Sequence, residues 1–487
     1  MGLTASMDIA RTSLSARQEQ STIVSRNIAN ADNPYASRKI ANTVSALGGG
    51  VRLQSITRVA DSLLFQKVLV SNADLAGQKA VVDALNTINE TVADPELDFS
   101  PAALTGKLND ALQQLSSGPQ DPVRAKAVLD AATDLATGLN AATSAVQGVR
   151  RQADQDIQVA VAKINTTLAD IQTLNQQIVN GTFAGDDVTD QLDQRDKLIA
   201  DISNEIGIRV AHRSQNDVAI YTDSGVTLFD NTARQVSFVP TPVYDSTIAG
   251  NAVVVDGVPV TGPAASMPIG SGRLKGLTDV RDTYAVTYQT QLDEIARGLI
   301  ETFAEQDQSG SGLPDATGIF SHVGSPTVPT SGVLQSGLAG EISVNAAVDP
   351  SRGGNLDLIR DGGINGAAYA YNTSGADGFS GRIRQLADGL VANRPFDPVA
   401  ESGNQDSVLD FASTSVGWLQ EQRRVASSDL SFKQTVQERS SDALNQVIGV
   451  NLDNEMTLLL EIERSYQATS RLITTIDDMY QYLLTAV

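Results

Sequence analysis

Apolar side chains recur at alternating spacings of three and four residues at both ends of this 487-residue chain. Such spacing places side chains on one face of a helix, as along the seam of a coiled coil. The N-terminal stripe contains Leu3, Met7, Ala10, Leu14, Val24 and Ile28. The C-terminal stripe contains Leu459, Ile462, Tyr466, Ile473, Ile476, Tyr480 and Leu483. Both ends are therefore predicted to be long amphipathic helices.

Each terminal helix is expected to lack a second apolar face. Alone, such a helix would expose its stripe to water and be only marginally stable. One isolated stripe is usually buried inside its own domain. Two stripes at opposite termini instead favour helices that pair with each other and with those of neighbouring copies. We therefore interpret both stripes as an assembly interface.

The composition excludes several classes of partner and site. The chain has 35 Lys and Arg against 57 Asp and Glu residues, a formal net charge of −22. Because phosphate contacts need a basic surface, this charge argues against a nucleic-acid partner. The sequence has no cysteine, which excludes disulfides and thiolate metal sites. No apolar run approaches a membrane span, so we expect no membrane insertion.

The sequence offers no recognisable catalytic chemistry. It has only two histidines, and it shows no P-loop, no glycine-rich dinucleotide turn and no HExxH-like pair. An enzyme would need convergent acid, base or nucleophilic groups, or a cofactor motif. We therefore predict a protein that is not an enzyme, with no catalytic residues, no cofactor and no metal site.

The periodicity along the chain predicts helical flanks around a β-rich middle. Beyond the N-terminal helix, helical spacing is found at 59–92, 123–180, 186–206, 276–304 and from about 406 to the end. Short β-branched runs separated by Gly, Pro, Asn or Asp begin at residue 207 and predict strands. Further strands are expected at 51–56, 340–345 and 355–360. The fold class is thus multidomain α+β, with paired terminal helices, a long helical bundle and an inserted β-rich region.

This pattern suggests a division into three parts. Residues 1–55 and 440–487 would form a terminal helical assembly domain. The helical bundle domain is assigned to 56–206, 274–308 and 382–439. An outward-facing β-rich domain, or two, is assigned to 207–273 and 309–381.

Four segments resemble bacterial flagellar proteins, in the right order along the chain. SRNIANADNP at 25–34 resembles a motif shared by flagellar rod, hook and hook-associated proteins. QLDQRDKLIADIS at 191–203 is similar to a helix of flagellar hook-associated protein 1. Residues 273–303 and 449–484 resemble that family's second core segment and its C-terminal signature. The motif residues that we single out are Asn27, Ala29, Asn30, Pro34, Asp193, Gln194, Arg195 and Asp196.

The first motif departs from the family pattern just after Pro34. The family usually continues as Pro-Gly-Tyr-Ser-Arg, whereas this chain has Tyr35 and Ala36 in place of the Gly and Tyr. Glycine would permit a positive φ at no steric cost, but tyrosine would not adopt it readily. The turn after Pro34 is therefore expected to differ locally.

For the charged residues of the second motif, the sequence favours a plain structural interpretation. Nothing near Asp193, Arg195 and Asp196 supplies a nucleophile or a base. We expect these side chains to lie on a solvated helix face with local ion pairs, each worth only a few tenths of a kcal/mol.

The resemblance implies a structural role in the flagellum. It implies a subunit that assembles with copies of itself into a helical tube at the distal end of the hook and joins hook to filament. The expected partners are the hook protein, a second junction protein and through it flagellin, and an export chaperone on the C-terminal helix. The chain would be extracellular in the flagellum and would leave through the flagellar type III apparatus without a cleaved signal peptide.

Two alternatives remain open from the sequence. The chain could be another flagellar axial protein: a hook protein, a flagellin or the second junction protein. The long helical block between 59 and 207 argues against a hook protein, and a flagellin would not be expected to carry SRNIANADNP. A non-flagellar secreted adhesin could share the acidic β-rich middle, but not the paired terminal helices.

Overall fold

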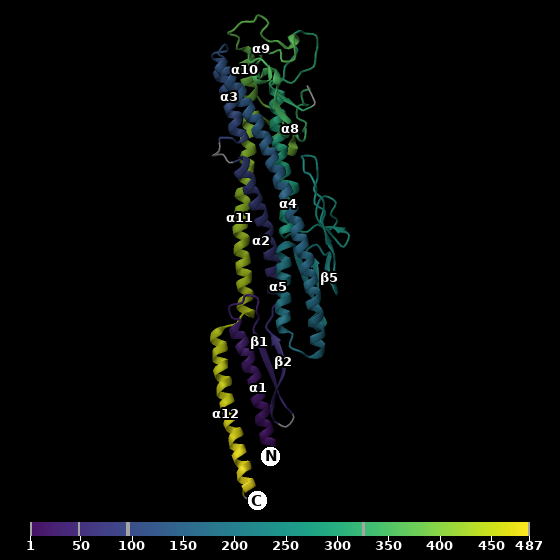
Figure 1. The fold of residues 1–487 in the computed structure, drawn as a ribbon, viewed down its shortest axis with the longest axis vertical. Helices are drawn as coiled ribbons and strands as arrows, with labels where there is room; N and C mark the ends of the chain where they lie inside the picture. The colour runs from purple at the N-terminus through teal and green to yellow at the C-terminus, as the bar shows by residue number, and fades with distance from the viewer. Residues whose placement is uncertain (1, 47–48, 94–97, 324–326, 486–487) are drawn as a thin grey trace.

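The computed structural model describes residues 2–46, 49–93, 98–323 and 327–485. They form a long rod with both chain ends at the same tip (Figure 1). At that tip α1 (Leu3–Ala29) and α12 (Leu452–Thr485) lie side by side. Near the ends of the two helices, Tyr480 Oη donates a hydrogen bond to Thr4 Oγ1 at 3.0 Å. The predicted pairing of the terminal helices is confirmed.

A β-hairpin packs against α1. Its strands, β1 (Lys39–Ser45) and β2 (Val51–Arg58), are antiparallel, with a shift of register between Asn42 and Thr43. The sequence predicted a strand near β2 but missed β1, whose residues do not alternate cleanly between buried and exposed. We call α1, β1, β2 and α12 the terminal unit.

Long helices build the body of the rod (Figure 1). They are α2 (Ser62–Ile88), α4 (Pro122–Ala184), α5 (Thr189–Glu205) and α11 (Val408–Ile448). Side-chain caps fix where α2, α4 and α11 begin, because Asp61, Asp121 and Ser407 each accept a hydrogen bond from a backbone N–H of the first turn. Helix α4 ends at Ala184 and is capped by Gly185, which has a φ of 80°, a left-handed conformation that glycine adopts freely.

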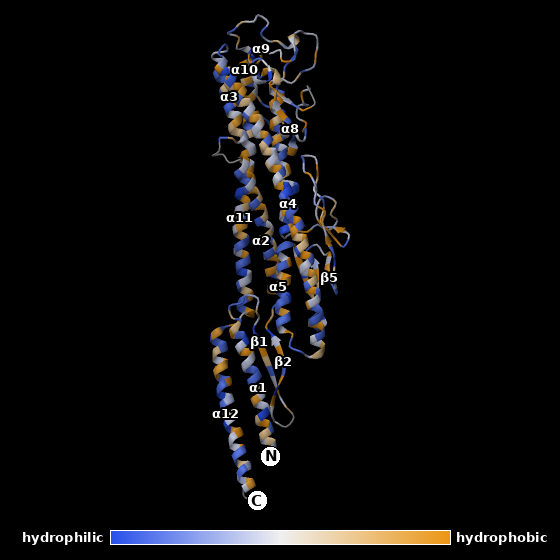
Figure 2. Ribbon diagram, viewed as in Figure 1, coloured by the Kyte–Doolittle hydropathy of each residue, from blue (hydrophilic) through white to orange (hydrophobic). Residues whose placement is uncertain are grey.

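The rod helices share one apolar core. Side chains such as Leu69, Leu135, Ile164, Leu292 and Phe411 are fully buried in it. Figure 2 shows apolar and polar residues alternating along each rod helix rather than forming long apolar runs. This is the pattern of helices that bury one face and leave the other in water.

The remaining helices pack onto this body. Helix α6 (Arg273–Asp279) continues through a π-helical turn (Val280–Tyr284) into α7 (Ala285–Thr302), which is buried along most of its length. A second π-helical turn (Asn89–Ala93) follows α2. Helices α3 (Pro101–Ser116) and α10 (Gly381–Val391) lie at the end of the rod far from the termini (Figure 1).

The strands after residue 207 flank one side of α4 (Figure 1). An antiparallel sheet has the order β3 (Ile208–His212), β4 (Val218–Thr222), β5 (Thr227–Asp230) and β6 (Thr232–Ala233). A smaller sheet has the order β7 (Val236–Ser237), β8 (Val254–Val255) and β9 (Val258–Pro259). The change from helix to strand expected at Gly207 is therefore present.

Residues 309–323 and 327–381 lie elsewhere, at the far end of the rod (Figure 1). Strands β10 (Phe320–His322) and β11 (Ile342–Val344) pair there beside the short helices α8 (Leu338–Glu341) and α9 (Asp357–Asp361). The strand predicted at 355–360 is wrong, since this segment contains α9. Leu356 and Ile359, three positions apart, both pack on the core, which one helical turn permits and a strand does not.

Short elements complete the chain. Strands β12 (Arg394–Pro395) and β13 (Gln405–Asp406) pair just before α11. Single 3₁₀ turns occur at Ser214–Asn216, Ala346–Val348, Pro350–Arg352, Ala367–Tyr369 and Pro398–Ala400. The division into three domains with the boundaries given above stays a prediction.

Candidate assembly site

The predicted N-terminal stripe lies partly in the interior of the terminal unit. Ala10 and Val24 are buried, and Leu3, Met7, Leu14 and Ile28 are half-buried. Because α1 contacts α12, β1 and β2, this stripe faces the chain's own hairpin and C-terminal helix. Whether it also contacts a neighbouring copy stays a prediction.

The predicted C-terminal stripe behaves in the same way. Ile462 and Ile476 are buried, and within the described part of the chain α12 packs mainly against α1. The other stripe residues are half-buried (Leu459, Ile473 and Tyr480) or exposed (Tyr466 and Leu483). The structure therefore brings the two predicted stripes together within one chain.

A second row of apolar side chains on α12 remains exposed. It consists of Leu460, Leu472, Met479 and Tyr482, which share one side of the helix, whereas the exposed Leu452 and Leu484 lie on other sides. The expectation that each terminal helix lacks a second apolar face is wrong for α12. The signal was present in the sequence, because 472 and 479 are seven apart and 479 and 482 are three apart. Exposed apolar surface of this kind is typical of protein–protein interaction sites.

The first and last family motifs meet through Asn27 and Glu455. Asn27 Nδ2 donates to Glu455 Oε2 at 3.0 Å, and Arg38 Nε donates to Glu455 Oε1 at 2.6 Å. Asn27 also binds the backbone of Lys39 at the start of β1. Its Oδ1 accepts from Lys39 N at 3.0 Å, and its Nδ2 donates to Lys39 O at 2.9 Å. Both Asn27 and Glu455 are buried, so each needs these partners to offset the loss of water.

Sequence reasoning did not single out Glu455. A carboxylate on the stripe side of an amphipathic helix, four residues before Leu459, is a signal that it could have used, since buried charges are kept only where they are paired. The other residues of the first motif shape the end of α1. Asn30 is its C-cap and donates from Nδ2 to Arg26 O at 2.9 Å, whereas Ala29 and Pro34 are exposed.

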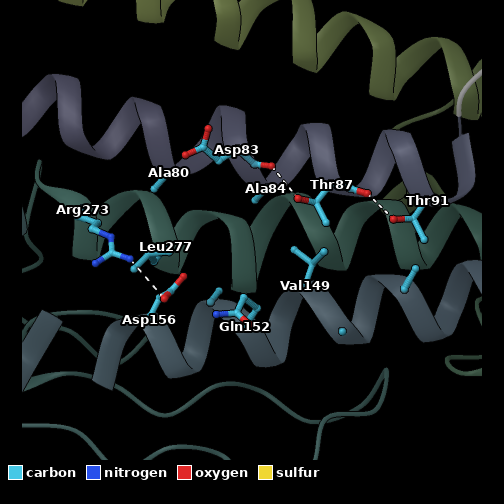
Figure 3. A pocket seen from close by; sticks show the side chains of 13 residues that line it. Ala80, Asp83, Ala84, Thr87, Thr91, Val149, Gln152, Asp156, Arg273 and Leu277 are labelled. Carbon is cyan, nitrogen blue, oxygen red and sulfur yellow. Dashed lines mark hydrogen bonds and ion pairs between the residues drawn. The ribbon is translucent and has the colours of Figure 1, made fainter. Parts of the chain in front are cut away.

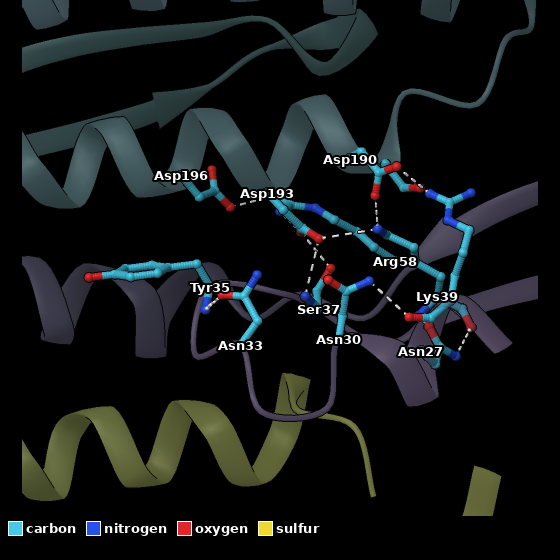
Figure 4. A network of polar contacts seen from close by, with 12 residues as sticks. Asn27, Asn30, Asn33, Tyr35, Ser37, Lys39, Arg58, Asp190, Asp193 and Asp196 are labelled. Atoms are coloured by element: carbon cyan, nitrogen blue, oxygen red, sulfur yellow. Dashed lines mark hydrogen bonds and ion pairs between the residues drawn. The ribbon is translucent and has the colours of Figure 1, made fainter. Parts of the chain in front are cut away.

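The second motif reaches across to the terminal unit (Figure 4). Asp193 on α5 accepts from Ser37 Oγ at 2.6 Å, from Ser37 N at 3.1 Å and from Arg58 Nη1 at 2.9 Å. Arg58 Nη2 also donates to Asp196 Oδ2 at 2.6 Å. The expectation of a solvated face with local ion pairs is wrong here, because Asp193 is only 9% exposed and its partners come from 135 and 156 positions away.

Arg195 points into the rod instead. It is 1% exposed, and its Nη1 donates to Asn175 Oδ1 at 2.8 Å and to Asn216 O at 2.5 Å. Burial lowers the pKa of Arg195 to about 10, and the neighbouring Asp196 offsets part of that loss. Arg195 therefore ties α5 to α4 and to the loop before β4, while Gln194 beside it is exposed.

The turn after Pro34 tolerates tyrosine. Ala36 N donates to Asn33 O at 3.0 Å and Tyr35 N donates to Asn33 Oδ1 at 3.1 Å. Tyr35 is not among the described residues with a positive φ, so this turn makes no demand for glycine. The Tyr35 ring lies 5.5 Å from Lys197 Nζ, which is a cation–π contact with α5.

A groove of about 420 Å³ lies between α2, α4 and α6 (Figure 3). Small apolar side chains such as Ala80 and Ala84 line much of it, and Arg273 pairs with Asp156 at 3.4 Å. Thr87 and Thr91 each donate their hydroxyl to a carbonyl of their own helix. These hydroxyls are thus engaged by the backbone, and the groove does not assemble an acid–base pair around a nucleophile.

No helix in the described part of the chain combines the length and the apolar character needed to cross a membrane.

Comparisons with known proteins agree with the motifs. A family profile for the flagellar hook-associated protein FlgK helical domain matches residues 85–320. A profile for the flagellar basal body rod FlgEFG protein C-terminal region matches 447–486. Flagellar hook-associated protein 1 of Bacillus subtilis (strain 168) is 22% identical over 511 residues, which cover 97% of this chain and 96% of that relative. The chain is similar to flagellar hook-associated protein 1 over nearly its whole length.

Other matches are shorter. Flagellar hook-associated protein 1 of Salmonella typhimurium (strain LT2) is 25% identical over 343 residues, covering 66% of this chain and 59% of that relative. The solved structure of the flagellar hook junction protein FlgK from Burkholderia pseudomallei is 21% identical, with a TM-score of 0.43, covering 53% of this chain and 46% of that one. The similarity to flagellar hook-associated protein 1 supports a structural role for this chain at the hook–filament junction of the flagellum.

Proposed function

We propose that the terminal unit is the part of this protein that binds neighbouring subunits in the junction. Helices α1 and α12 of one chain would pack against those of adjacent chains and form the inner wall of a hollow tube. The rod would stand outside that wall, and the strands beside α4 would face outward. Head-to-tail contacts of this kind generate a helical arrangement rather than a closed dimer.

The exposed apolar row on α12 carries this proposal. The predicted stripe is largely occupied by α1 of the same chain, so the row that includes Leu460, Leu472 and Met479 is the apolar surface left for a neighbour. These three side chains are each more than half exposed. Covering them would remove apolar surface from water, at roughly 25 cal/mol per Å².

The partners would follow from this position. One edge of the ring of subunits would contact the hook protein, and the other would contact a second junction protein and through it flagellin. Before assembly the same row on α12 would be covered by an export chaperone, since an uncovered apolar helix invites aggregation. The net charge of −22 would keep the unassembled chain soluble.

The route and the mode of action are part of the proposal. The chain would leave the cell through the flagellar type III apparatus and would act outside the cell. Its action would be mechanical rather than catalytic, and it would need no cofactor.

Deleting the gene tests the proposed role. Cells without this protein should build hooks of normal length but retain no filament, and flagellin should appear as monomer in the medium. The reason is geometric. The hook wall and the filament wall pack differently, and only a subunit that fits both can join them without leaving apolar surface exposed. Electron microscopy of the hooks and flagellin immunoblots of the medium measure this outcome.

Two other outcomes would overturn it. Absence of hooks in the deletion strain would indicate a hook-protein role, and filaments of normal length and attachment would exclude a junction role. Complementation with the full-length gene is the control. Complementation with a gene lacking 210–270, closed by a short Gly/Ser link, should restore more filaments than one lacking 445–487.

A further inference from the structure

A row of apolar side chains on α11, in the body of the rod, faces solvent. Val425 is 40% exposed, Phe432 69% and Val436 38%. Spacings of seven and four residues place these three side chains on one side of the helix. Another side of the same helix, which includes Leu419 and Ala426, is buried in the core. We call Val425, Phe432 and Val436 the α11 row.

The groove between α2, α4 and α6 is the opposite kind of surface (Figure 3). Small residues such as Ala84, Ala145 and Gly148 line it, and among its described lining residues none belongs to α11. It extends along 80–91 of α2 and 145–156 of α4. At a helical rise of 1.5 Å per residue these walls are about 17 Å long, and the α11 row has the same length. Bulky side chains in a row and small ones in a groove are complementary in shape.

One end of the groove is charged (Figure 3). Asp83, Asp156 and Arg273 lie toward that end, and Thr91 lies toward the other. Arg273 pairs with Asp156 at 3.4 Å. Asp83 is exposed and, in the part of the chain that the structure describes, makes no ion pair. A cation entering at this end would therefore find a carboxylate without a partner.

Arg439 supplies a cation beside the α11 row. It is exposed and follows Val436 by three positions, so it lies on nearly the same side of α11. Among the described residues it makes no ion pair. If Arg439 of one copy meets Asp83 of another, the row extends from the charged end of the groove toward Thr91. The docked α11 then runs antiparallel to α2.

The chain's own α11 is antiparallel to α2 as well. Gln437 Nε2 donates to Asn72 Oδ1 at 3.1 Å, and Arg423 Nε donates to Asn86 Oδ1 at 3.1 Å. The docked copy therefore points in the same direction as the copy that receives it. A tube of equivalent subunits requires this, because contacts between two different surfaces repeat from copy to copy and do not close on a pair.

We propose that the α11 row of one copy docks in the groove of a neighbouring copy in the junction. The partner is thus a second copy of this chain. The contact is small, since three such side chains bury on the order of 500 Å² in total, whereas a stable pair needs roughly 1,200 Å² or more. It forms only where the terminal units already hold copies side by side. The inference rests on the assembly role proposed above and adds a second interface to it.

Disulfide cross-linking in assembled flagella tests this contact. With Arg439 beside Asp83, Val436 of the docked copy comes level with Thr87, which lines the groove. The chain has no cysteine, so Thr87→Cys/Val436→Cys introduces its only thiols. Oxidation of isolated flagella should convert most of this protein into dimers and higher bands, seen by immunoblot of a non-reducing gel.

Three controls accompany the cysteine pair. Thr87→Cys alone and Val436→Cys alone should stay monomeric on the gel. The matched pair Ala169→Cys/Val436→Cys should stay monomeric too, because Ala169 is exposed on α4 but does not line the groove. Dimers of the matched pair at an equal yield would overturn the proposal, since they would show that the cross-link does not report the groove.

Reversal of the two charges tests the orientation. In the Thr87→Cys/Val436→Cys background, Asp83→Arg or Arg439→Asp alone should lower the yield of dimers about twofold to fivefold. The two reversals together should restore it, because the pair is re-formed with exchanged signs. A double reversal that cross-links no better than either single reversal would contradict the proposed orientation.

The outcomes separate this contact from the assembly role. Monomer alone from Thr87→Cys/Val436→Cys, in flagella that carry filaments, would overturn the docking and leave the assembly role intact. If the cysteine pair prevents assembly, Phe432→Asp decides the question. Phe432 is exposed in the single chain, so the variant should unfold like the wild type yet halve the number of attached filaments or lower it further. Filaments in normal number would overturn the docking.

Discussion

Asn27 Nδ2 donates a 3.0 Å hydrogen bond to Glu455 Oε2, joining two residues that are 428 positions apart. The contact is buried, and Arg38, which directly precedes β1, donates a further hydrogen bond to Glu455. It connects the first family motif to the last one. The two motifs are therefore spatial partners, and the folding of the terminal unit depends on both ends of the chain being present.

Replacing Glu455 by Gln should loosen the terminal unit. The substitution keeps the shape but removes the charge that holds Arg38 and Asn27, and hydrogen bonds to charged groups are worth about 1.5–3 kcal/mol. We expect faster hydrogen exchange in α1 and the first turns of α12, with little change in α4. Glu461→Gln, exposed on the same helix, should change exchange by less than about 0.5 kcal/mol. Equal effects of the two variants would contradict this role for Glu455.

Exposed and buried positions of α12 should separate assembly from folding. Leu472→Glu/Met479→Glu alters side chains that are exposed in the monomer, so its thermal unfolding should match the wild type within about 0.5 kcal/mol. Cells carrying it should retain no filaments. Ile462→Asp/Ile476→Asp should lose filaments too, but should also expose α1 and α12 to protease, because burying a carboxylate costs several kcal/mol. Normal filaments on the Leu472/Met479 variant would exclude the exposed row as an interface.

A pair of glycines sets how closely α2 and α6 approach. A Cβ added at Gly276 would lie 2.1 Å from Gly77 O, a clash with backbone that cannot relax by rotating a side chain. Gly276→Ala should therefore lower the free energy of unfolding by about 1–3 kcal/mol. Gly106→Ala in α3, where an added Cβ meets nothing within 4 Å, should raise it by about 0.5–1 kcal/mol. Urea unfolding measures both, and a stabilising Gly276→Ala would refute the close approach.

The carboxylate of Asp293 should make stability depend on pH. Burial raises its pKa to about 6 from the usual 3.8, and the nearby Glu294 adds to this, although N–H groups of Gly337 and Ala339 oppose it. Between these values the folded chain binds more protons than the unfolded chain, so stability falls as pH rises from about 4 to about 6. Two pKa units correspond to about 3 kcal/mol.

Asp293→Asn removes this dependence. Relative to the wild type, the variant should become more stable by about 2–3 kcal/mol as pH rises from about 4 to about 6, with no further change up to pH 7. Urea unfolding over that range gives the difference. Asp442→Asn, at an exposed position on α11, should give a curve parallel to the wild type. A parallel curve for Asp293→Asn would show that its carboxylate is already ionised at pH 4.

The spacing of apolar residues at the two ends was sufficient to predict the paired terminal helices. That pattern is local, because spacings of three and four define a helix face whatever lies opposite. The motifs were likewise sufficient to recognise the resemblance to flagellar hook-associated protein 1. The runs of Gly, Pro and β-branched residues after residue 207 were sufficient to place the main strands. Each of these signals is a local pattern in the sequence.

The tertiary structure alone decided which side chains are partners. Asp193 accepts hydrogen bonds from Ser37 and Arg58, and Glu455 accepts one from Asn27. These partners are too far apart in the sequence for any local pattern to connect them. It also decided that the predicted stripe on α12 turns inward, leaving a second apolar row outside, and that 355–360 contains a helical turn. The physical reason is the same in each case. Burial depends on what the folded chain brings alongside a side chain, and the free energy of a buried charge depends on its partner rather than on its neighbours in sequence.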